Sequence, residues 1–152
     1  MLRKAMIRDI KEIHALLQIY SKKGELLARP LSELYDHLRD FWVFQDEETG
    51  RIEGCCALQF CWDDLAEIRS LAVAEDYTGR GIGTLLVDRS IQEALVFKIP
   101  RLFTLTYRPS FFKRFDFNTI DKAELPIKIW SDCIMCVNFP ECDETAMIKK
   151  LS

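Results

Sequence analysis

Three glycines at alternate positions, Gly79, Gly81 and Gly83, are the first residues of this 152-residue chain to indicate chemistry. They follow the apolar segment 65–73, whose core alternates as a buried strand does, and they precede an apolar helical pattern over 85–95. A glycine turn at the start of a helix presents unpaired N–H groups and the positive end of the helix dipole. Because glycine has no Cβ, an anion can approach this backbone closely. The stretch therefore predicts a phosphate-binding turn.

The glycine spacing excludes two common phosphate sites. A Walker loop needs a lysine directly after its last glycine, and Thr84 follows Gly83 instead. A dinucleotide fingerprint needs Gly-x-Gly-x-x-Gly, whereas this turn reads Gly-x-Gly-x-Gly. The residue pattern alone thus reaches no further than an α/β domain that binds a pyrophosphate.

An ionisable pair, Glu67 and Arg69, interrupts the apolar segment before the turn. Residues two apart share one face of a regular strand, so these side chains can form a salt bridge. A charge inside an apolar strand must be either paired or used in chemistry. The sequence leaves both interpretations open: a structural ion pair, or a carboxylate that acts as a general base.

Apolar periodicity places these residues among alternating strands and helices. It predicts strands over 2–7, 41–45, 52–61, 65–73, 101–107 and 146–151, and helices over 10–20, 31–38, 85–95 and 109–115. Asp9, with Glu12 three residues later, is expected to cap the first helix, and Gly24 to end it. The chain from Phe117 onward is expected to be irregular until the last strand. The predicted fold is one α/β (α+β) domain over 1–152, a mixed, largely antiparallel sheet between helices.

The composition and charge of the chain argue against several classes of function. The net charge of −3 argues against general nucleic-acid binding. No apolar run reaches the length of a membrane span, and the N-terminus lacks a signal peptide's apolar core, so a cytoplasmic location is expected. Cysteines should then be reduced thiols. Cys55, Cys56 and Cys61 share one strand pattern without a nearby histidine, which favours small buried side chains over nucleophiles.

A second cysteine group, Cys133, Cys136 and Cys142, lies near the C-terminus. Two of the three have the spacing of metal ligands, but a tetrahedral zinc site would need Asp132 or Asp143 as its fourth ligand. We predict packed thiols without a metal, with zinc as the alternative.

The glycine turn resembles the pyrophosphate loop of the GNAT acyltransferase superfamily, Gln/Arg-x-x-Gly-x-Gly/Ala. Gly81 and Gly83 match this pattern, and Thr78 stands in place of Gln or Arg. The predicted element order is similar to the GNAT fold over essentially the whole chain. Further segments resemble short stand-alone amino-acid N-acetyltransferases of the N-acetylglutamate synthase type, namely 24–29, 62–73, 105–107, 111–114 and 128–133. The resemblance implies transfer of acetyl from acetyl-CoA to the α-amine of L-glutamate, the entry step of arginine biosynthesis.

That reaction needs a base, because an amino-acid α-amine is mostly protonated near neutral pH. A positioned general base contributes roughly 10²–10⁴-fold to the rate. The resemblance implies Glu67 as this base and Tyr107 as a candidate proton donor or substrate contact. Many relatives use a Tyr in the following helix, where this chain has Phe112, and a Gly where it has Asp116. The departing thiolate is therefore protonated by Tyr107 or water, or it leaves unprotonated.

The resemblance also implies which residues bind the two substrates. Those expected to contact acetyl-CoA come from the central strand, the turn and the 109–115 helix: Leu71, Ala72, Val73, Thr78, Gly79, Arg80, Gly81, Ile82, Gly83, Thr84, Phe111, Phe112 and Arg114. Phe111 and Phe112 can equally be ordinary core residues. Cationic side chains suit the carboxylates of an acidic amino acid. Arg29 and Arg69 lead, and Lys113 and Lys128 are further candidates.

Two other functions stay open on the sequence. One is a GNAT enzyme that acetylates another amine, such as a polyamine or a peptide N-terminus. The other is a non-catalytic module that senses acetyl-CoA, which Thr78 and Phe112 favour while Glu67, Arg69 and Tyr107 oppose it. A thiol-release assay over a panel of amines separates the three. The sequence also leaves open whether the chain forms a homodimer.

Overall fold

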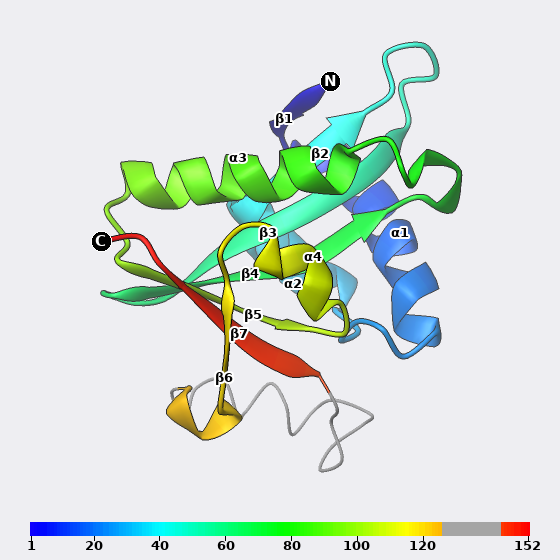
Figure 1. Ribbon diagram of the computed structural model, residues 1–152. Helices are drawn as coiled ribbons and strands as arrows, with labels where there is room; N and C mark the ends of the chain where they lie inside the picture. Colours follow the sequence, from blue (N-terminus) through cyan, green and yellow to red (C-terminus); the bar gives the residue numbers. More distant parts are fainter. Residues whose placement is uncertain (126–143) are drawn as a thin grey trace.

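The computed structural model describes residues 1–125 and 144–152 (Figure 1). Its sheet has seven strands in the order β1-β2-β3-β4-β5-β7-β6. The strands are β1 (Leu2–Lys4), β2 (Phe41–Gln45), β3 (Ile52–Trp62), β4 (Leu65–Val73), β5 (Arg101–Thr106), β6 (Asn118–Ile120) and β7 (Thr145–Lys150). The α-helices are α1 (Ile10–Lys22), α2 (Leu31–Asp36), α3 (Ile82–Val96) and α4 (Pro109–Lys113). The mixed, mostly antiparallel sheet with flanking helices is the fold predicted from the sequence.

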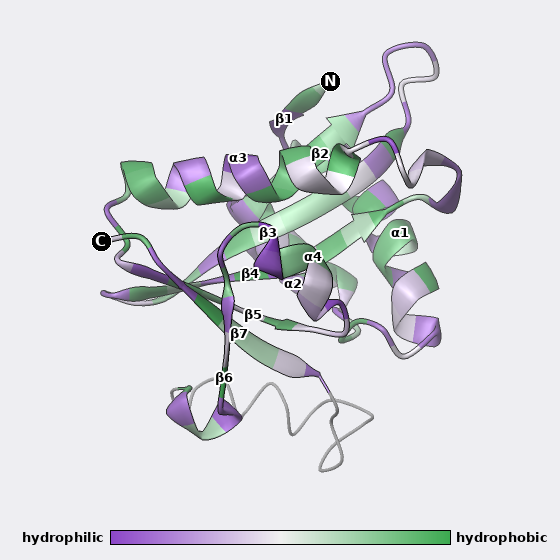
Figure 2. Cartoon of the chain, in the orientation of Figure 1, coloured by the Kyte–Doolittle hydropathy of each residue, from purple (hydrophilic) through white to green (hydrophobic). Residues whose placement is uncertain are grey.

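The sheet is covered on both faces, so its inner strand β3 is buried on both sides. On β3, Cys56 and Leu58 pack with α3, whereas Cys55 and Ala57 face the cluster that α1 and α2 complete. Figures 1 and 2 show α3 lying over hydrophobic residues of the sheet, with α1 and α2 on the opposite face. Alternate side chains of one strand therefore serve two different cores.

The sheet opens between β4 and β5, which form its parallel pair. Their pairing runs only from Leu65 opposite Arg101 to Glu67 opposite Phe103, although both strands continue beyond that point. At the next position, the Thr104 hydroxyl donates a hydrogen bond to the Ile68 carbonyl, 2.8 Å away. The two strands thus separate after Glu67, which creates space between them.

A β-bulge bends β4 just after this point. Arg69 pairs with Ala57 and Ala72 with Cys55, so one residue of β3 opposes two residues of β4. Ser70, at the bulge, has φ +55°, a left-handed conformation that is uncommon for a residue with a Cβ. The bulge re-aims the end of β4, while the segment from Glu67 to Arg69 keeps regular pairing.

The start of the chain corrects two predictions. The first strand ends at Lys4, and a 3-10 turn over Ile7–Asp9 precedes α1. Asp9 does not cap α1, because its own backbone is already helical. Its carboxylate instead accepts hydrogen bonds from Arg3, at 2.7 and 3.0 Å, and from the Met6 N–H, at 2.7 Å. The Glu12 carboxylate accepts from the Ile52 N–H rather than closing a capping box.

The chain after Phe117 corrects a third prediction. It was expected to be irregular, but β6 pairs antiparallel with β7 from Asn118 opposite Ile148 to Ile120 opposite Ala146. The pairing partner lies some thirty positions away in the sequence, so no local pattern could indicate this short strand. The remaining predicted strands and helices are confirmed within a few residues, and Gly24, with φ +74°, follows α1 as expected. None of the described helices is long and apolar enough to cross a membrane.

Candidate active site

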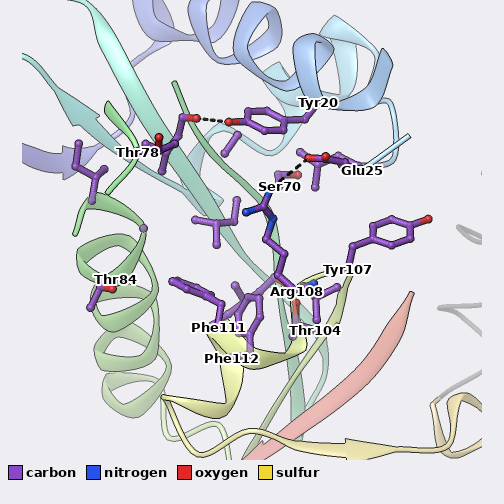
Figure 3. Close-up of a pocket in the computed structure, with 18 of the residues that line it drawn as sticks. Tyr20, Glu25, Ser70, Thr78, Thr84, Thr104, Tyr107, Arg108, Phe111 and Phe112 are labelled. Atoms are coloured by element: carbon purple, nitrogen blue, oxygen red, sulfur yellow. Dashed lines mark hydrogen bonds and ion pairs between the residues drawn. The ribbon is translucent and has the colours of Figure 1, made fainter. Parts of the chain in front are cut away.

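A cavity of about 480 Å³ occupies the space between the separated ends of β4 and β5 (Figure 3). Its walls come from the end of β4, the glycine turn, β5, α4 and the chain after α1. The lining residues are Tyr20, Glu25, Leu26, Ile68, Arg69, Ser70, Leu71, Ala72, Val73, Tyr77, Thr78, Gly79, Gly81, Ile82, Gly83, Thr84, Thr104, Leu105, Thr106, Tyr107, Arg108, Phe111, Phe112 and Arg114. Most of the residues predicted to contact acetyl-CoA thus line this one cavity.

The glycine turn has the conformation that an anion cradle needs. Gly79 and Gly81 have φ +78° and +79°, which residues with a Cβ rarely adopt. A Cβ at either would meet no atom within 4 Å, so the space in front of the turn is open. The first helical bond of α3 runs from the Leu85 N–H to the Gly81 carbonyl, 3.1 Å. The preceding N–H groups of this helix end have no helical acceptor and can bind phosphate.

The turn is fixed from outside by side chains. The Tyr77 hydroxyl donates to the Asp46 carboxylate in the β2–β3 connection. The Thr78 hydroxyl donates to the Glu75 carbonyl, 2.8 Å. The Arg80 guanidinium lies 4.5 Å from the Tyr77 ring centre and is not among the cavity-lining residues. Thr78, the departure from the Gln/Arg pattern, thus makes a local hydrogen bond in the turn.

Glu67 and Arg69 form the ion pair that their spacing allows. The Glu67 Oε1 and Arg69 Nη1 atoms lie 3.8 Å apart, and both side chains are about nine-tenths buried. Arg69 Nη1 also donates to the Gln59 Oε1, 3.4 Å away. Arg69 lines the cavity, whereas Glu67 lies just behind its wall, where β4 and β5 are still paired. The structural interpretation is confirmed, and the role of Glu67 as a base stays a prediction.

Arg29 is buried behind the β4 bulge. Its Nη1 donates to the Ser70 hydroxyl at 3.1 Å, and its Nε donates to Glu33 at 2.9 Å. Its guanidinium lies 5.4 Å from the Phe41 ring centre. Burial lowers the pKa of Arg29, and the nearby charge of Arg69 lowers it further. Among the described residues, the buried Arg29 Nη2 has no hydrogen-bond acceptor. An unsatisfied buried N–H of a cation is unfavourable, so this atom would gain from an anionic acceptor. Arg29 is, however, not among the cavity-lining residues.

The remaining predicted residues divide into two groups. Phe111 and Phe112 line the cavity with ring centres 5.2 Å apart, and the buried Phe112 also belongs to the core under α3; their role as a wall of the CoA arm stays a prediction. Tyr107 lines the cavity, and Figure 3 draws its hydroxyl pointing away from Phe111 and Phe112. Lys113 is exposed and is not a lining residue. Lys128 lies outside the described residues.

Several lining residues were missed from the sequence. Tyr20 and Glu25 come from the end of α1 and the chain after it, and Arg108 follows β5. The Tyr20 hydroxyl donates to the Val73 carbonyl. A polar or charged residue in a connecting segment carries no local signal of the site it will reach. Only the resemblance of segment 24–29 to known N-acetyltransferases pointed towards Glu25.

The cysteines of β3 are not nucleophiles. Cys55, Cys56 and Cys61 are buried and form no disulfide within the described residues, and small buried side chains were predicted here. Burial raises the pKa of the Cys55 thiol, and it raises the pKa of Cys56 to about 12, so neither is a thiolate near neutral pH. Within residues 1–125 and 144–152, no group of three or more His, Cys, Asp or Glu side chains is placed to hold a metal. The C-terminal cysteines, 133–142, lie outside these residues.

The sheet opening, with a glycine turn at its edge, is the site of an α/β domain that binds a phosphate-bearing ligand. The chain belongs to the acetyltransferase (GNAT) family, which it matches over residues 8–117. It is 40% identical to an uncharacterized N-acetyltransferase of Chlorobaculum tepidum over 151 residues, covering 98% of this chain and 95% of the relative. It is 36% identical to the amino-acid acetyltransferase of Mycobacterium tuberculosis, covering 90% and 78% of the two chains. It spans only 29% of the amino-acid acetyltransferase of Neisseria meningitidis, at 35% identity.

Solved structures support the same assignment. A Mycobacterium tuberculosis protein in complex with CoA superposes with a TM-score of 0.85 at 31% identity, covering 100% of this chain and 99% of that one. The N-acetylglutamate synthase of Neisseria gonorrhoeae, complexed with coenzyme A and N-acetyl-glutamate, superposes with a TM-score of 0.89 at 28% identity, covering 100% and 35%. The chain is therefore an acyltransferase with acetyl-CoA as its cosubstrate, and the open glycine turn fits the pyrophosphate of that molecule.

Proposed function

We propose that the chain transfers the acetyl group of acetyl-CoA to the α-amine of an acidic amino acid, with L-glutamate preferred. This is the first step of arginine biosynthesis and would take place in the cytoplasm. The names of the relatives support an amino-acid acceptor. The observation that carries the proposal is the buried Arg29, whose Nη2 has no acceptor among the described residues and which lies close to the charge of Arg69.

The positive charges of Arg29 and Arg69 favour a bound carboxylate near them. Arg29 and Arg69 are two positive charges in a largely buried setting. Arg29 is partly paired with Glu33 and Arg69 with Glu67, which lowers the cost of burying each charge. The Arg29–Glu33 pair satisfies only one edge of the guanidinium. A substrate carboxylate would accept from Arg29 Nη2 and reduce the repulsion between the two cations. Such a contact would place the attached α-amine at the β4 bulge.

In this proposal Glu67 receives the proton that the α-ammonium must lose before attack. Glu67 lies behind the cavity wall, so the proton reaches its carboxylate through a water molecule. Arg69 Nη1, 3.8 Å from Glu67 Oε1, pairs with this carboxylate in the structure. The amine nitrogen bonds to the thioester carbonyl carbon, the C–S bond breaks, and the thiolate takes a proton from Tyr107 or water. The thioester of acetyl-CoA supplies the activated acetyl group.

The same proposal gives the cofactor-binding residues their roles. The backbone of Gly79 to Thr84 would hold the pyrophosphate, and Arg114 would lie near the phosphates. The pantetheine arm would follow Leu71 to Val73, beyond the point where β4 and β5 separate. Phe111 and Phe112 would form the apolar wall of the arm.

The test is a thiol-release assay with acetyl-CoA over acidic, neutral and basic amino acids and a polyamine, in the wild type and in Arg29→Gln. L-Glutamate should be the best acceptor. Arg29→Gln should raise its KM about thirtyfold or more, because truncating one partner of a buried charge pair is costly, while the KM for acetyl-CoA stays unchanged. Arg51→Gln, which changes an exposed Arg in an ion pair with Glu53, is the control. A polyamine as best acceptor, or an unchanged glutamate KM in Arg29→Gln, would contradict the proposal.

A further inference from the structure

An ion pair crosses the cavity between two segments that are distant in the sequence. Glu25 lies in the chain between α1 and α2, and Arg108 lies between β5 and α4. The Arg108 Nη2 and Glu25 Oε2 atoms are 3.7 Å apart, and both residues line the cavity. Figure 3 shows the Arg108 side chain extending from the end of β5 towards Glu25, with Ser70 beside their meeting point. The pair therefore joins two walls of the cavity beside the bulge residue Ser70.

The Glu25–Arg108 ion pair can open easily, so that Arg108 can bind another carboxylate. The Arg108 side chain is 74% exposed and that of Glu25 38%, and the 3.7 Å separation is longer than a direct hydrogen bond. Exposed ion pairs contribute little to stability, so the partners separate readily. The Arg29–Glu33 contact, by comparison, has a length of 2.9 Å and a guanidinium that is 1% exposed. Arg108, like Arg114, is thus an exposed cation that lines the cavity, whereas the Arg69 side chain is about nine-tenths buried and Arg29 is not among the lining residues. Of the two exposed arginines, Arg108 is the one paired with Glu25 beside Ser70.

The buried cations leave the second carboxylate of an acidic acceptor without an obvious partner. Arg69 is already close to Glu67 and donates to Gln59. Arg29 can offer Nη2 to one carboxylate. A second carboxylate on the same small molecule would need another guanidinium within the cavity, and Arg108 lines it.

We propose that Arg108 binds the side-chain carboxylate of the acceptor and that Glu25 is an internal competitor, which occupies Arg108 until an acidic amino acid displaces it. The inference rests on the proposed function and names its specificity-determining residues. Exchange of one carboxylate for another keeps Arg108 paired in both states. An amide-bearing acceptor such as L-glutamine cannot make this exchange, because it would leave two unpaired charges at the mouth of the cavity.

The test compares Glu25→Gln, Arg108→Gln and the double variant. Glu25→Gln should lower the KM for L-glutamate about two- to fivefold, the usual worth of an exposed pair, without changing the KM for acetyl-CoA. Arg108→Gln should reduce the preference for L-glutamate over L-glutamine about tenfold or more. In the double variant the gain from Glu25→Gln should vanish, since the competition requires Arg108.

Asp64→Asn is the matched control, because it breaks the exposed Asp64–Arg101 pair (2.9 Å) away from the cavity. Calorimetric titration of L-glutamate into the CoA-bound protein should show the same order of affinities as the KM values. An unchanged or raised glutamate KM in Glu25→Gln would overturn the competition. An effect of Arg108→Gln on acetyl-CoA alone would assign Arg108 to a phosphate and overturn the inference as well. A wild type that acetylates no acidic amino acid would instead refute the proposed function itself.

Discussion

Replacing Gly83 by Val tests the phosphate-binding turn, because the GNAT loop pattern has Gly or Ala at this position and no larger side chain. A Cβ at Gly83 would lie 3.5 Å from the Phe111 ring, an ordinary van der Waals contact. Gly83 has no positive φ and stands in the first turn of α3, where Val is no worse a helix former than Gly. The variant should therefore remain folded. Its isopropyl group, however, would lie between Phe111 and Val73 on the cavity wall and crowd the N–H groups that the pyrophosphate needs.

The expected loss can be worked from the hydrogen bonds at risk. A side chain that keeps the pyrophosphate from one backbone N–H removes a bond to a charged group, worth about 1.5–3 kcal/mol. That corresponds to a CoA dissociation constant about 10- to 100-fold higher. Isothermal titration calorimetry with CoA measures it, and urea denaturation checks that the variant is folded. A folded Gly83→Val that binds CoA as the wild type does would refute the cradle.

Gly81→Ala and Gly50→Ala separate backbone strain from ligand contact. Gly81 (φ +79°) lines the cavity, and Gly50 (φ +72°) lies in the β2–β3 turn outside it. A Cβ at Gly50 would meet only the end of Gln45, at 4.0 Å. Both variants should lose about 1–2 kcal/mol of stability from the left-handed conformation. Only Gly81→Ala should also lose CoA affinity, and equal affinity losses in both would assign the effect to strain.

Two further predictions concern charged residues, namely Glu67 at the site and the Arg3–Asp9 ion pair outside it. Glu67→Gln should reduce the acetylation rate about 10²-fold near neutral pH, with a smaller deficit as the pH approaches the pKa of the amine, and it should leave calorimetric CoA affinity unchanged; a wild-type pH–rate profile would remove Glu67 from the mechanism. Burial acts to raise the pKa of Asp9, but hydrogen bonds from Arg3 and the Met6 N–H outweigh it and hold the pKa below its ordinary value. Arg3→Gln should therefore cost about 3 kcal/mol in urea denaturation at neutral pH. A carboxyl group whose pKa is lower in the folded than in the unfolded state stabilises the fold at pH values above its unfolded pKa, about 4. The stability advantage of the wild type over Asp9→Asn should therefore fade as the pH drops below that value. An advantage independent of pH would contradict this assignment.

Local patterns predicted the part of the fold that carries the cofactor site. Period-two apolar residues, a glycine turn and a helical stripe lie consecutively in the sequence, so β4, the turn and α3 could be recognised together. The same holds for the β2–β3 hairpin. By contrast, β6 depends on pairing with β7 across a long stretch of chain, and Asp9 is drawn away from its capping role by Arg3 on β1. Tertiary partners decided both cases.

The acceptor side of the site was harder to predict for the same reason. Arg29 and Arg69 were singled out, but nothing in the sequence indicated that Ser70 would form a bulge with positive φ and accept a hydrogen bond from Arg29. Arg108 and Glu25 lie in separate connections, and only the folded chain brings them within 3.7 Å. The separation of β4 from β5 after Glu67, which makes the cavity, follows from the geometry of the whole sheet rather than from any residue type.

A competition experiment tests the central claim most directly. The protein is incubated with limiting acetyl-CoA and an equimolar mixture of the common amino acids and a polyamine, and the acetylated products are identified by mass spectrometry. We expect N-acetyl-L-glutamate as the dominant product, with N-acetyl-L-glutamine far behind it. Acetylation mainly of a neutral or basic amino acid or of the polyamine, or release of thiol without any acetylated amino acid, would contradict the account.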